Sequence, residues 1–306
     1  MKLLITGATG FIGSRVVDAA LAAGHQVVAL VRREARDLRC GQLRCDLASS
    51  GPVDLAGHGI DVVIHLAAAL TGTAESQRQL TVAGTAKLLD GMAAAGIGRL
   101  VGVSSLAVID YPRLPAGTLI TESAPILHDG RSANAYATAK ADQEKLLNEF
   151  GTFPGHSVTV LRPGLVYDDR VLSDAYAGFR AGPLCVDVSH AGNVPVTNCG
   201  ALAQCLLRAA ARSAPGCKLY HVLDDPLPDQ RTYLRELRRR GRSAGLSLDW
   251  RLFRAAARAG QVVAGVLPVP DIFTSQGFAT RLKPFRYSAA RARQELQWTP
   301  AGGFAA

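Results

Sequence analysis

The chain has 306 residues, of which 48% are apolar. It is therefore long and apolar enough to bury a hydrophobic core, which excludes an intrinsically disordered protein. Its longest apolar stretch, at residues 252–267, is interrupted by Arg254 and Arg258 and falls short of the roughly 20 apolar residues that a membrane span requires. The formal net charge of +9 favours an anionic partner such as a phosphorylated cofactor, an acidic substrate or a membrane surface.

Short apolar runs alternate with segments of helical periodicity in the first half of the chain. The runs at residues 3–6, 26–31, 61–66, 100–104 and 157–161 predict strands, and the segments at 11–23, 74–95 and 133–150 predict helices. Strands separated by helices of this length form right-handed crossovers, so we predict an α/β fold with a Rossmann-type, doubly wound parallel sheet. A ligand then belongs at the carboxyl ends of the strands.

The second half of the chain is less regular. A helix is expected at 200–211, a strand at 218–223, a very basic helix at 230–240 and an amphipathic helix at 252–267. We expect residues 1–165 to form the Rossmann core and residues 166–306 a smaller C-terminal lobe, with the segment at about 196–223 returning to the core. Neither interleaved aromatic residues nor a DNA-reading fold accompanies the basic helix, so we expect a solvated helix face and no nucleic-acid partner.

A glycine-rich segment, GATGFIG at residues 7–13, joins the first predicted strand to the first predicted helix. Glycine lets the backbone approach a pyrophosphate closely, and the helix N-terminus offers free N–H groups and a positive dipole end. The segment therefore predicts a dinucleotide-binding loop. Its cofactor-binding residues are expected to be Gly7, Thr9, Gly10, Phe11, Ile12 and Gly13.

The end of the second predicted strand bears on the choice of dinucleotide. NAD enzymes usually place an acidic residue there to bind the ribose 2′-hydroxyl, whereas this chain continues from Val31 into Arg32 and Arg33. Guanidinium groups can instead form charge-assisted hydrogen bonds with a 2′-phosphate. We therefore expect NADP as the cofactor and consider NAD the less favoured alternative.

Six motifs follow one another in the order of a known family: TGATGFIG at residues 6–13, the Asp46-Leu47 pair, HLAA at 65–68, VSS at 103–105, YATAK at 136–140 and LRPGLVY at 161–167. With these motifs the chain resembles the extended short-chain dehydrogenases/reductases, the NAD-dependent epimerase/dehydratase family, over nearly its whole length. The resemblance implies that Ser105, Tyr136 and Lys140 are catalytic. It also implies cofactor contacts from Asp46, Leu47, Leu66, Ala67, Ala68, Val103, Tyr136, Lys140, Pro163, Gly164 and Val166.

Three segments depart from the family pattern. Thr81 stands where the family commonly has a supporting asparagine, Tyr167 is followed by Asp168 and Asp169 in place of Gly and Pro, and Thr197 and Asn198 replace two aspartates. These departures concern the substrate side of the site. Asp46 could also be a turn residue, and we interpret His65 as structural, because a lone histidine at a strand end more often satisfies the backbone.

The spacing of Tyr136 and Lys140 suits acid–base chemistry. Four residues apart on a helix, both side chains extend from one face. A free phenol has a pKa of about 10, and a nearby ammonium together with an oxidised nicotinamide favours its ionised form. Tyr136 would exchange a proton with the substrate oxygen while hydride moves to or from the nicotinamide, and Ser105 would align that oxygen.

These residues favour an NADP(H)-dependent oxidoreductase acting on a carbonyl compound or secondary alcohol. Two alternatives remain: a nucleotide-sugar epimerase that uses bound NAD, and a non-catalytic protein that senses the dinucleotide. A sugar diphosphate would need cations. Candidates for them are Arg170, Arg180, Arg231 and Arg281. An apolar carbonyl substrate would instead contact Leu70, Tyr111, Leu165, Tyr176 and Phe179.

The remaining features concern metal, location and assembly. The six cysteines lack a C-x-x-C pair and the spacings of common zinc sites, so we expect reduced thiols and no metal. The apolar run at the N-terminus is too short for a signal peptide, and we expect a cytoplasmic protein. The family resemblance also implies a homodimer, formed through the helices at 74–95 and 133–150.

Overall fold

The computed structural model describes residues 1–49, 51–127, 134–181, 184–242, 244–255 and 275–302. Its centre is a seven-stranded sheet with the order β12-β7-β5-β4-β1-β2-β3, in which every neighbouring pair is parallel. The strands are β1 (Lys2–Thr6), β2 (Gln26–Val31), β3 (Gly41–Arg44), β4 (Val62–His65), β5 (Arg99–Val103), β7 (Ser157–Pro163) and β12 (Gly216–Val222). The strand order reverses between β1 and β4, which is where a doubly wound sheet binds its ligand.

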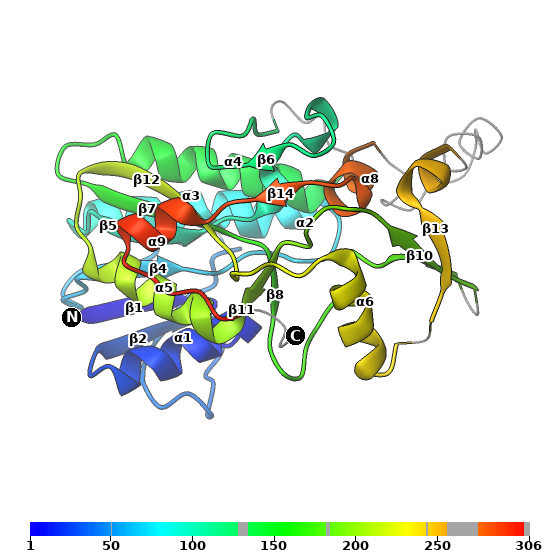
Figure 1. Ribbon diagram of the computed structural model, residues 1–306. Coiled ribbons are helices and arrows are strands. Elements are labelled where there is room, and N and C mark those ends of the chain that lie inside the picture. The colour runs from blue at the N-terminus through cyan, green and yellow to red at the C-terminus, as the bar shows by residue number, and fades with distance from the viewer. Residues whose placement is uncertain (50, 128–133, 182–183, 243, 256–274, 303–306) are drawn as a thin grey trace.

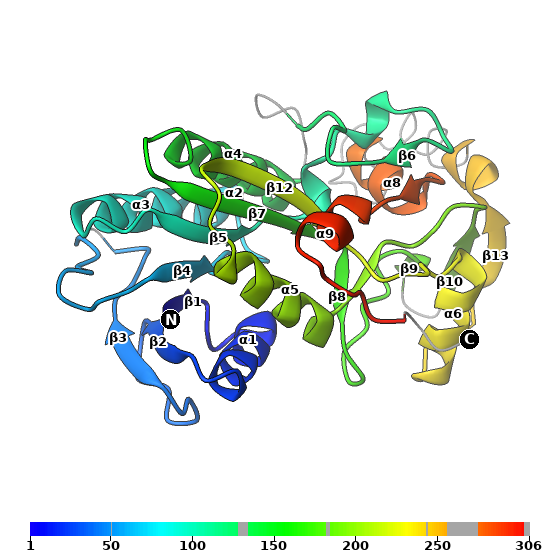
Figure 2. The same cartoon turned by 60° about the vertical axis from the view of Figure 1, so that its left-hand side comes forward.

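Helices cover both faces of this sheet, as Figures 1 and 2 show. One face carries α1 (Phe11–Ala22), α5 (Cys199–Ala211) and α9 (Ala290–Glu295). The other carries α2 (Ala74–Gln77), η1 (Arg78–Ala83), α3 (Gly84–Ala94) and α4 (Ala135–Phe150). The strands are apolar throughout because both faces are buried: along β1, Leu3 and Ile5 pack toward α1, while Leu4 between them packs toward α3.

A smaller lobe lies beyond the carboxyl ends of the strands (Figure 1). It contains a three-stranded sheet of β13 (Leu246–Asp249), β10 (Leu184–Ser189) and β9 (Gly178–Ala181), together with α6 (Gln230–Arg239) and α8 (Ser275–Leu282). Two short parallel pairs connect the lobe and the core: β8 (Leu165–Tyr167) with β11 (Val196–Asn198), and β6 (Leu119–Ile120) with β14 (Arg286–Tyr287). The strand β12 lies in the main sheet beside β7.

The predicted fold class is confirmed, but one predicted helix differs. Residues 74–95 do not form a continuous α-helix, because Arg78–Ala83 adopt a π-helix. Within this turn the Thr85 hydroxyl donates to the Thr81 carbonyl at 2.5 Å, and the Thr81 hydroxyl accepts the N–H of Ala69 at 3.0 Å. The Thr81 carbonyl thus has a side-chain hydrogen-bond donor in addition to the backbone groups of the helix. π-Helical turns of this kind occur often at functional sites.

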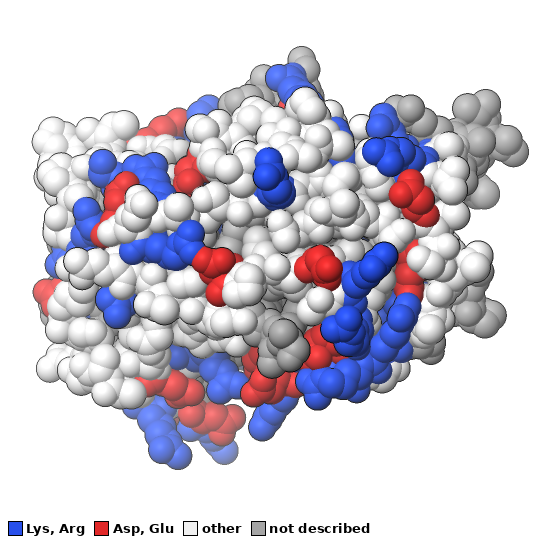
Figure 3. All heavy atoms as spheres, in the orientation of Figure 1, with Lys and Arg blue, Asp and Glu red and all other residues white. Residues whose placement is uncertain are grey.

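Two other expectations concern the C-terminal half. The basic helix is present as α6, and Figure 3 shows its cations interspersed with acidic groups rather than forming a uniform patch. Arg239 and Arg240 both pair with Glu236 at 2.7 Å. The amphipathic helix predicted at 252–267 falls mostly outside the described residues. Among the helices that are described, none is long and apolar enough to cross a membrane.

Candidate active site

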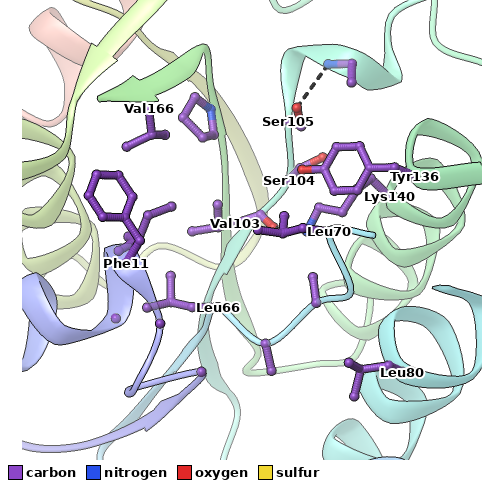
Figure 4. Close-up of a pocket in the computed structure, with 18 of the residues that line it drawn as sticks. Phe11, Leu66, Leu70, Leu80, Val103, Ser104, Ser105, Tyr136, Lys140 and Val166 are labelled. Atoms are coloured by element: carbon purple, nitrogen blue, oxygen red, sulfur yellow. Dashed lines mark hydrogen bonds between the residues drawn. The ribbon is translucent and has the colours of Figure 1, made fainter. Parts of the chain in front are cut away.

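A cavity of about 740 Å³ opens where the strand order reverses, at the carboxyl ends of the parallel strands. It brings together nearly all the residues expected from the sequence. These are Gly7, Thr9, Gly10, Phe11, Ile12, Gly13, Arg32, Leu47, Leu66, Ala67, Ala68, Val103, Ser105, Tyr136, Lys140, Pro163, Gly164 and Val166. Figure 4 shows Phe11 and Val166 on one side of the cavity and Tyr136 and Lys140 on the other.

The glycine loop forms one wall of this cavity, and its geometry requires two of its glycines. Gly7 has a φ of +67°, and a Cβ there would lie 2.9 Å from the backbone nitrogen of Ala67. A Cβ on Gly13 would lie 2.0 Å from the Gly7 carbonyl oxygen. The following helix α1 begins at Gly10 without a side-chain cap and without an acidic residue in its first turn. Its first N–H groups therefore remain available to an anionic group, and this wall fits the pyrophosphate of a dinucleotide.

The end of β2 supplies the next part of the wall. Arg32 is exposed and lines the cavity, and within the described part of the chain no acidic side chain pairs with it. Leu47 lines the cavity as well, but two expected neighbours do not. Arg33 lies outside it, and the carboxylate of Asp46 accepts the N–H of Ala48 at 2.9 Å, as a turn residue would. Arg32 is thus the cation available to a 2′-phosphate at this end.

Tyr136 enters the cavity from the first turn of α4. Asn134 caps this helix by accepting the N–H of Ala137 at 3.0 Å, which fixes where the helix begins. Ser105 lies two residues beyond the end of β5, caps the short helix η2 (Leu106–Val108) and lines the same cavity as Tyr136. Burial raises the pKa of Tyr136 above its ordinary value, while the neighbouring Ser105 acts in the opposite direction.

Lys140 lies one turn further along α4, where its side chain is almost wholly buried. Its Nζ donates to the carbonyl oxygen of Val103 at 2.6 Å and to Oε1 of Gln143 at 2.5 Å. Burial lowers the pKa of Lys140 to about 7, although the charge of Glu144 opposes this shift. The sequence led us to expect that the lysine would lower the pKa of Tyr136. In the structure burial outweighs any such effect, so an ionised phenol would depend on the positive charge of an oxidised nicotinamide.

A buried ion pair anchors α4, which carries Tyr136 and Lys140, to the sheet. Glu144 accepts Nε of Arg162 at 3.0 Å and the hydroxyl of Ser104 at 2.7 Å. These contacts tie α4 to β7 and to the end of β5, which carries Ser105. Removing one partner of such a pair is costly, because it would leave a buried charge uncompensated. The pair therefore holds α4 in one place against the sheet, and with it the position of Tyr136 relative to Ser105.

The other end of the cavity is mainly apolar. Leu70, Leu106, Leu165 and Tyr176 line it, together with Ser173. Two residues expected to contact an apolar substrate do not reach it. Tyr111 is fully buried and packs against Phe285 with ring centroids 5.2 Å apart, and Phe179 packs in the lobe. Among the described residues that line the cavity, the basic ones are Arg32 and Lys140, so none of the four arginines considered for a sugar diphosphate is there.

The departures from the family pattern have local structural roles. Asp168 forms an ion pair with Arg15 at 3.2 Å and so connects α1 to the loop after β8. Thr197 accepts the N–H of Gly164 at 2.9 Å and donates to the Val222 carbonyl, which holds the cavity wall at Gly164 in place. Sequence reasoning overlooked these contacts because they join segments distant along the chain, and it also overlooked the contact of Gln143 with Lys140 on the same helix.

Comparisons with known proteins agree with this geometry. The model of the NAD dependent epimerase/dehydratase family matches residues 3–182. A 2-alkyl-3-oxoalkanoate reductase of Stenotrophomonas maltophilia is 30% identical over 241 residues, which cover 74% of this chain and 72% of the relative. A UDP-glucose 4-epimerase of Yersinia enterocolitica is 33% identical over 183 residues, covering 53% and 52%.

Solved structures share the whole architecture. MoeE5 in complex with UDP-glucose and NAD superposes with a TM-score of 0.71 at 20% identity, covering 99% of this chain and 95% of that chain. At this identity the likeness concerns the fold.

Proposed function

Because this chain belongs to the NAD dependent epimerase/dehydratase family, we propose that it is an NADP(H)-dependent oxidoreductase that reduces a carbonyl compound or oxidises the corresponding secondary alcohol. The observation that carries the proposal is that Tyr136, Ser105 and Lys140 line one cavity together with the glycine loop and an apolar chamber. A nicotinamide dinucleotide, when bound, supplies or accepts the hydride. The residues of this chain provide the binding, the alignment and the proton.

Each group in the cavity has one role. The glycine loop and the N-terminus of α1 bind the pyrophosphate, and Arg32 binds the 2′-phosphate. Ser105 donates a hydrogen bond to the substrate oxygen and orients it. Tyr136 releases its phenolic proton to that oxygen during reduction and regains one from the hydroxyl during oxidation. The raised pKa of Tyr136 supports reduction, because a phenol that stays protonated at neutral pH is ready to act as the acid.

The apolar end of the cavity indicates the kind of substrate. Leu70, Leu165 and Tyr176 offer contact surface to alkyl or aromatic groups and no charge to bind a diphosphate. We therefore favour a carbonyl compound with an apolar substituent, in line with the name of the Stenotrophomonas relative. A nucleotide-sugar epimerase is the second candidate, since the similarity to a UDP-glucose 4-epimerase is of comparable strength over half the chain.

The cofactor preference is tested by fluorescence titration with NADPH and NADH. We expect tighter binding of NADPH in the wild type and loss of this preference in Arg32→Ala. One charge-assisted hydrogen bond is worth about 1.5–3 kcal/mol, so the variant should bind NADPH more weakly by about tenfold or more. Arg36→Ala removes another exposed arginine of the same loop and serves as the matched control. Equal affinities in the wild type would show the 2′-phosphate assignment to be wrong.

The activity is tested by NADPH consumption with a panel of aliphatic and aromatic ketones and aldehydes, with Tyr136→Phe as the inactive control. A UDP-sugar assayed without added cofactor tests the epimerase. Turnover of the UDP-sugar alone would replace the reductase by the epimerase. Tight NADPH binding without turnover of any compound would indicate a protein that senses the dinucleotide.

A further inference from the structure

A series of buried hydrogen bonds runs behind the wall of the cavity, from the catalytic helix to the first strand. It connects Lys140 and Gln143 on α4, Thr85 on α3, His65 on β4 and Thr6 on β1. The side chains of all five are at most 3% exposed. They come from four separate elements of the chain, and of the five only Lys140 was among the expected site residues, because His65 was interpreted as structural.

The direction of each hydrogen bond follows from the donors present, beginning at Thr6. The Thr6 hydroxyl oxygen accepts the N–H groups of Leu66 and Ala67, both at 3.1 Å. With both lone pairs engaged, its own proton points to Nδ1 of His65 at 2.7 Å. Burial lowers the pKa of His65 to about 3, so the ring is neutral and carries its proton on Nε2. That proton is donated to the hydroxyl oxygen of Thr85 at 2.8 Å.

The orientation of Gln143 is fixed in the same way. The Thr85 hydroxyl donates to the Thr81 carbonyl, so its oxygen can only accept, and it accepts Nε2 of Gln143 at 2.8 Å. The amide nitrogen therefore faces Thr85, and the amide oxygen faces Lys140. If the amide were rotated by 180°, its NH₂ group would face the Lys140 amine, so that hydrogen-bond donors would oppose each other. The Thr85 hydroxyl oxygen would then lose the N–H group that it accepts from Gln143. Gln143 is thus held as an obligate acceptor for the Lys140 amine.

We propose that Gln143 is a positioning residue of the dinucleotide site. Its amide oxygen and the carbonyl of Val103 accept two N–H groups of the protonated Lys140 side chain and hold it at the cavity wall, with the third N–H left for the cofactor. The amide also links this amine, through Thr85 and His65, to the backbone of Leu66 and Ala67, which lines the same cavity. The proposal rests on the proposed dinucleotide site but not on the identity of the carbonyl substrate.

Other charged or titratable groups also face Lys140 and must be distinguished from Gln143. Glu144 lies next along α4 and favours the charged amine, and its carboxylate is itself neutralised by Arg162 of β7. His65 of β4 is neutral, and Tyr136 lies one turn away on α4. Gln143 is uncharged, and among the described residues its side chain is the only one that accepts a direct hydrogen bond from Nζ of Lys140. Replacing it tests the contact without removing a charge.

The experiment compares Gln143→Met, which removes the acceptor, with Gln143→Glu, which keeps it and adds a negative charge. NADPH binding is titrated by fluorescence across pH values from about 6 to 9.5. NADPH is an anion, so its affinity should fall as Lys140 loses its proton, and the midpoint of that fall reports the lysine. We expect Gln143→Met to bind NADPH about tenfold more weakly and to move the midpoint down. Gln143→Glu should move it up by about one pH unit or more.

The matched control is Gln77→Met, which removes another buried glutamine from the same face of the sheet and is 3% exposed. Shifts of the two Gln143 variants in the same direction, or unchanged NADPH binding in a folded Gln143→Met, would overturn the proposal. Chemical unfolding without nucleotide provides the second measurement. The rise of stability between about pH 7.5 and 9.5 should be smaller in Gln143→Glu than in the wild type, because the acid keeps Lys140 charged in the folded chain.

This second measurement also distinguishes the two proposals. If the wild type bound no NADPH but Gln143→Glu reduced the rise of stability as expected, the contact would stand and the proposed function would fail. An equal rise in the wild type and Gln143→Glu would refute the influence of residue 143 on Lys140, whatever the enzyme binds. Should Gln143→Met fail to fold, Gln143→Glu alone decides by the direction of its shift.

Discussion

Replacing Lys140 by methionine should change how the stability of the protein depends on pH. The lysine is 3% exposed, and burial lowers its pKa to about 7 in the folded chain, against 10.5 for a free lysine. Between these two values the unfolded chain holds a proton that the folded chain does not. The free energy of unfolding therefore rises with pH across this window and levels off outside it.

The size of the effect follows from the same two values. Each pH unit inside the window is worth at most about 1.4 kcal/mol, so between about pH 7.5 and 9.5 the contribution of Lys140 to the free energy of unfolding grows by about 2–3 kcal/mol. Methionine has no proton to bind and removes this contribution. The stability of the wild type relative to Lys140→Met should therefore increase by about 2–3 kcal/mol over this range. A constant difference caused by the lost hydrogen bonds to Val103 and Gln143 adds to it.

The assay is urea unfolding at several pH values for the wild type, Lys140→Met and Lys145→Met. Other groups also titrate in this range, so the quantity to follow is the difference between the wild type and each variant. Lys145 is exposed on the same helix and is the matched control, for which the difference should stay level with pH. If the difference in the free energy of unfolding between the wild type and Lys140→Met also stayed constant with pH, the inference that Lys140 is neutral above pH 7 in the folded chain would be refuted.

Three further predictions concern catalysis, assembly and acid stability. Tyr136→Phe should lower the rate of carbonyl reduction about 10²–10⁴-fold with little change in NADPH affinity, whereas full activity would exclude Tyr136 as the acid. Light scattering at micromolar concentration should give about twice the chain mass of 32.2 kDa if α3 and α4 form the dimer implied by the family resemblance; a monomer mass would contradict it. Burial lowers the pKa of His65 and of His221 to about 3, so each should contribute about 1 kcal/mol per pH unit to the fall of stability from pH 6 to 4, and replacing either by glutamine should reduce that slope by about this amount.

More of the residues expected on the cofactor side than of those expected on the substrate side line the cavity. The loop from Gly7 to Gly13 has a signature that is local in sequence, because a strand, a turn and a helix start fix its backbone within a few residues. Tyr136 and Lys140 are similarly fixed by their spacing on one helix. Arg33, expected from its place after the second strand, and Asp46, expected from the family resemblance, do not line the cavity, and the Asp46 carboxylate instead accepts the N–H of Ala48.

The substrate side depends on contacts that leave no pattern in sequence. Tyr111 and Tyr176 are both tyrosines in irregular segments, yet one is a core residue packed on Phe285 and the other lines the cavity. Likewise, nothing in the sequence distinguishes Gln143 from the other polar residues of α4. Its contacts with Thr85 and His65, which are 58 and 78 positions away in the sequence, exist only in the folded chain. Such a residue can be assigned a role only from the directions of its hydrogen bonds.

Burial shifts the pKa values of Tyr136 and Lys140, both on α4, in opposite directions, yet both shifts favour the neutral form of the side chain. It raises the pKa of the Tyr136 phenol and lowers that of the Lys140 amine, so both groups favour neutrality in the folded chain. Neutral tyrosine is the form that gives a proton to a carbonyl oxygen, whereas oxidation requires the phenolate. If the proposed function holds, we therefore expect reduction across the neutral range. Oxidation is expected only where the pH, or the positive ring of the oxidised cofactor, overcomes the effect of burial on Tyr136.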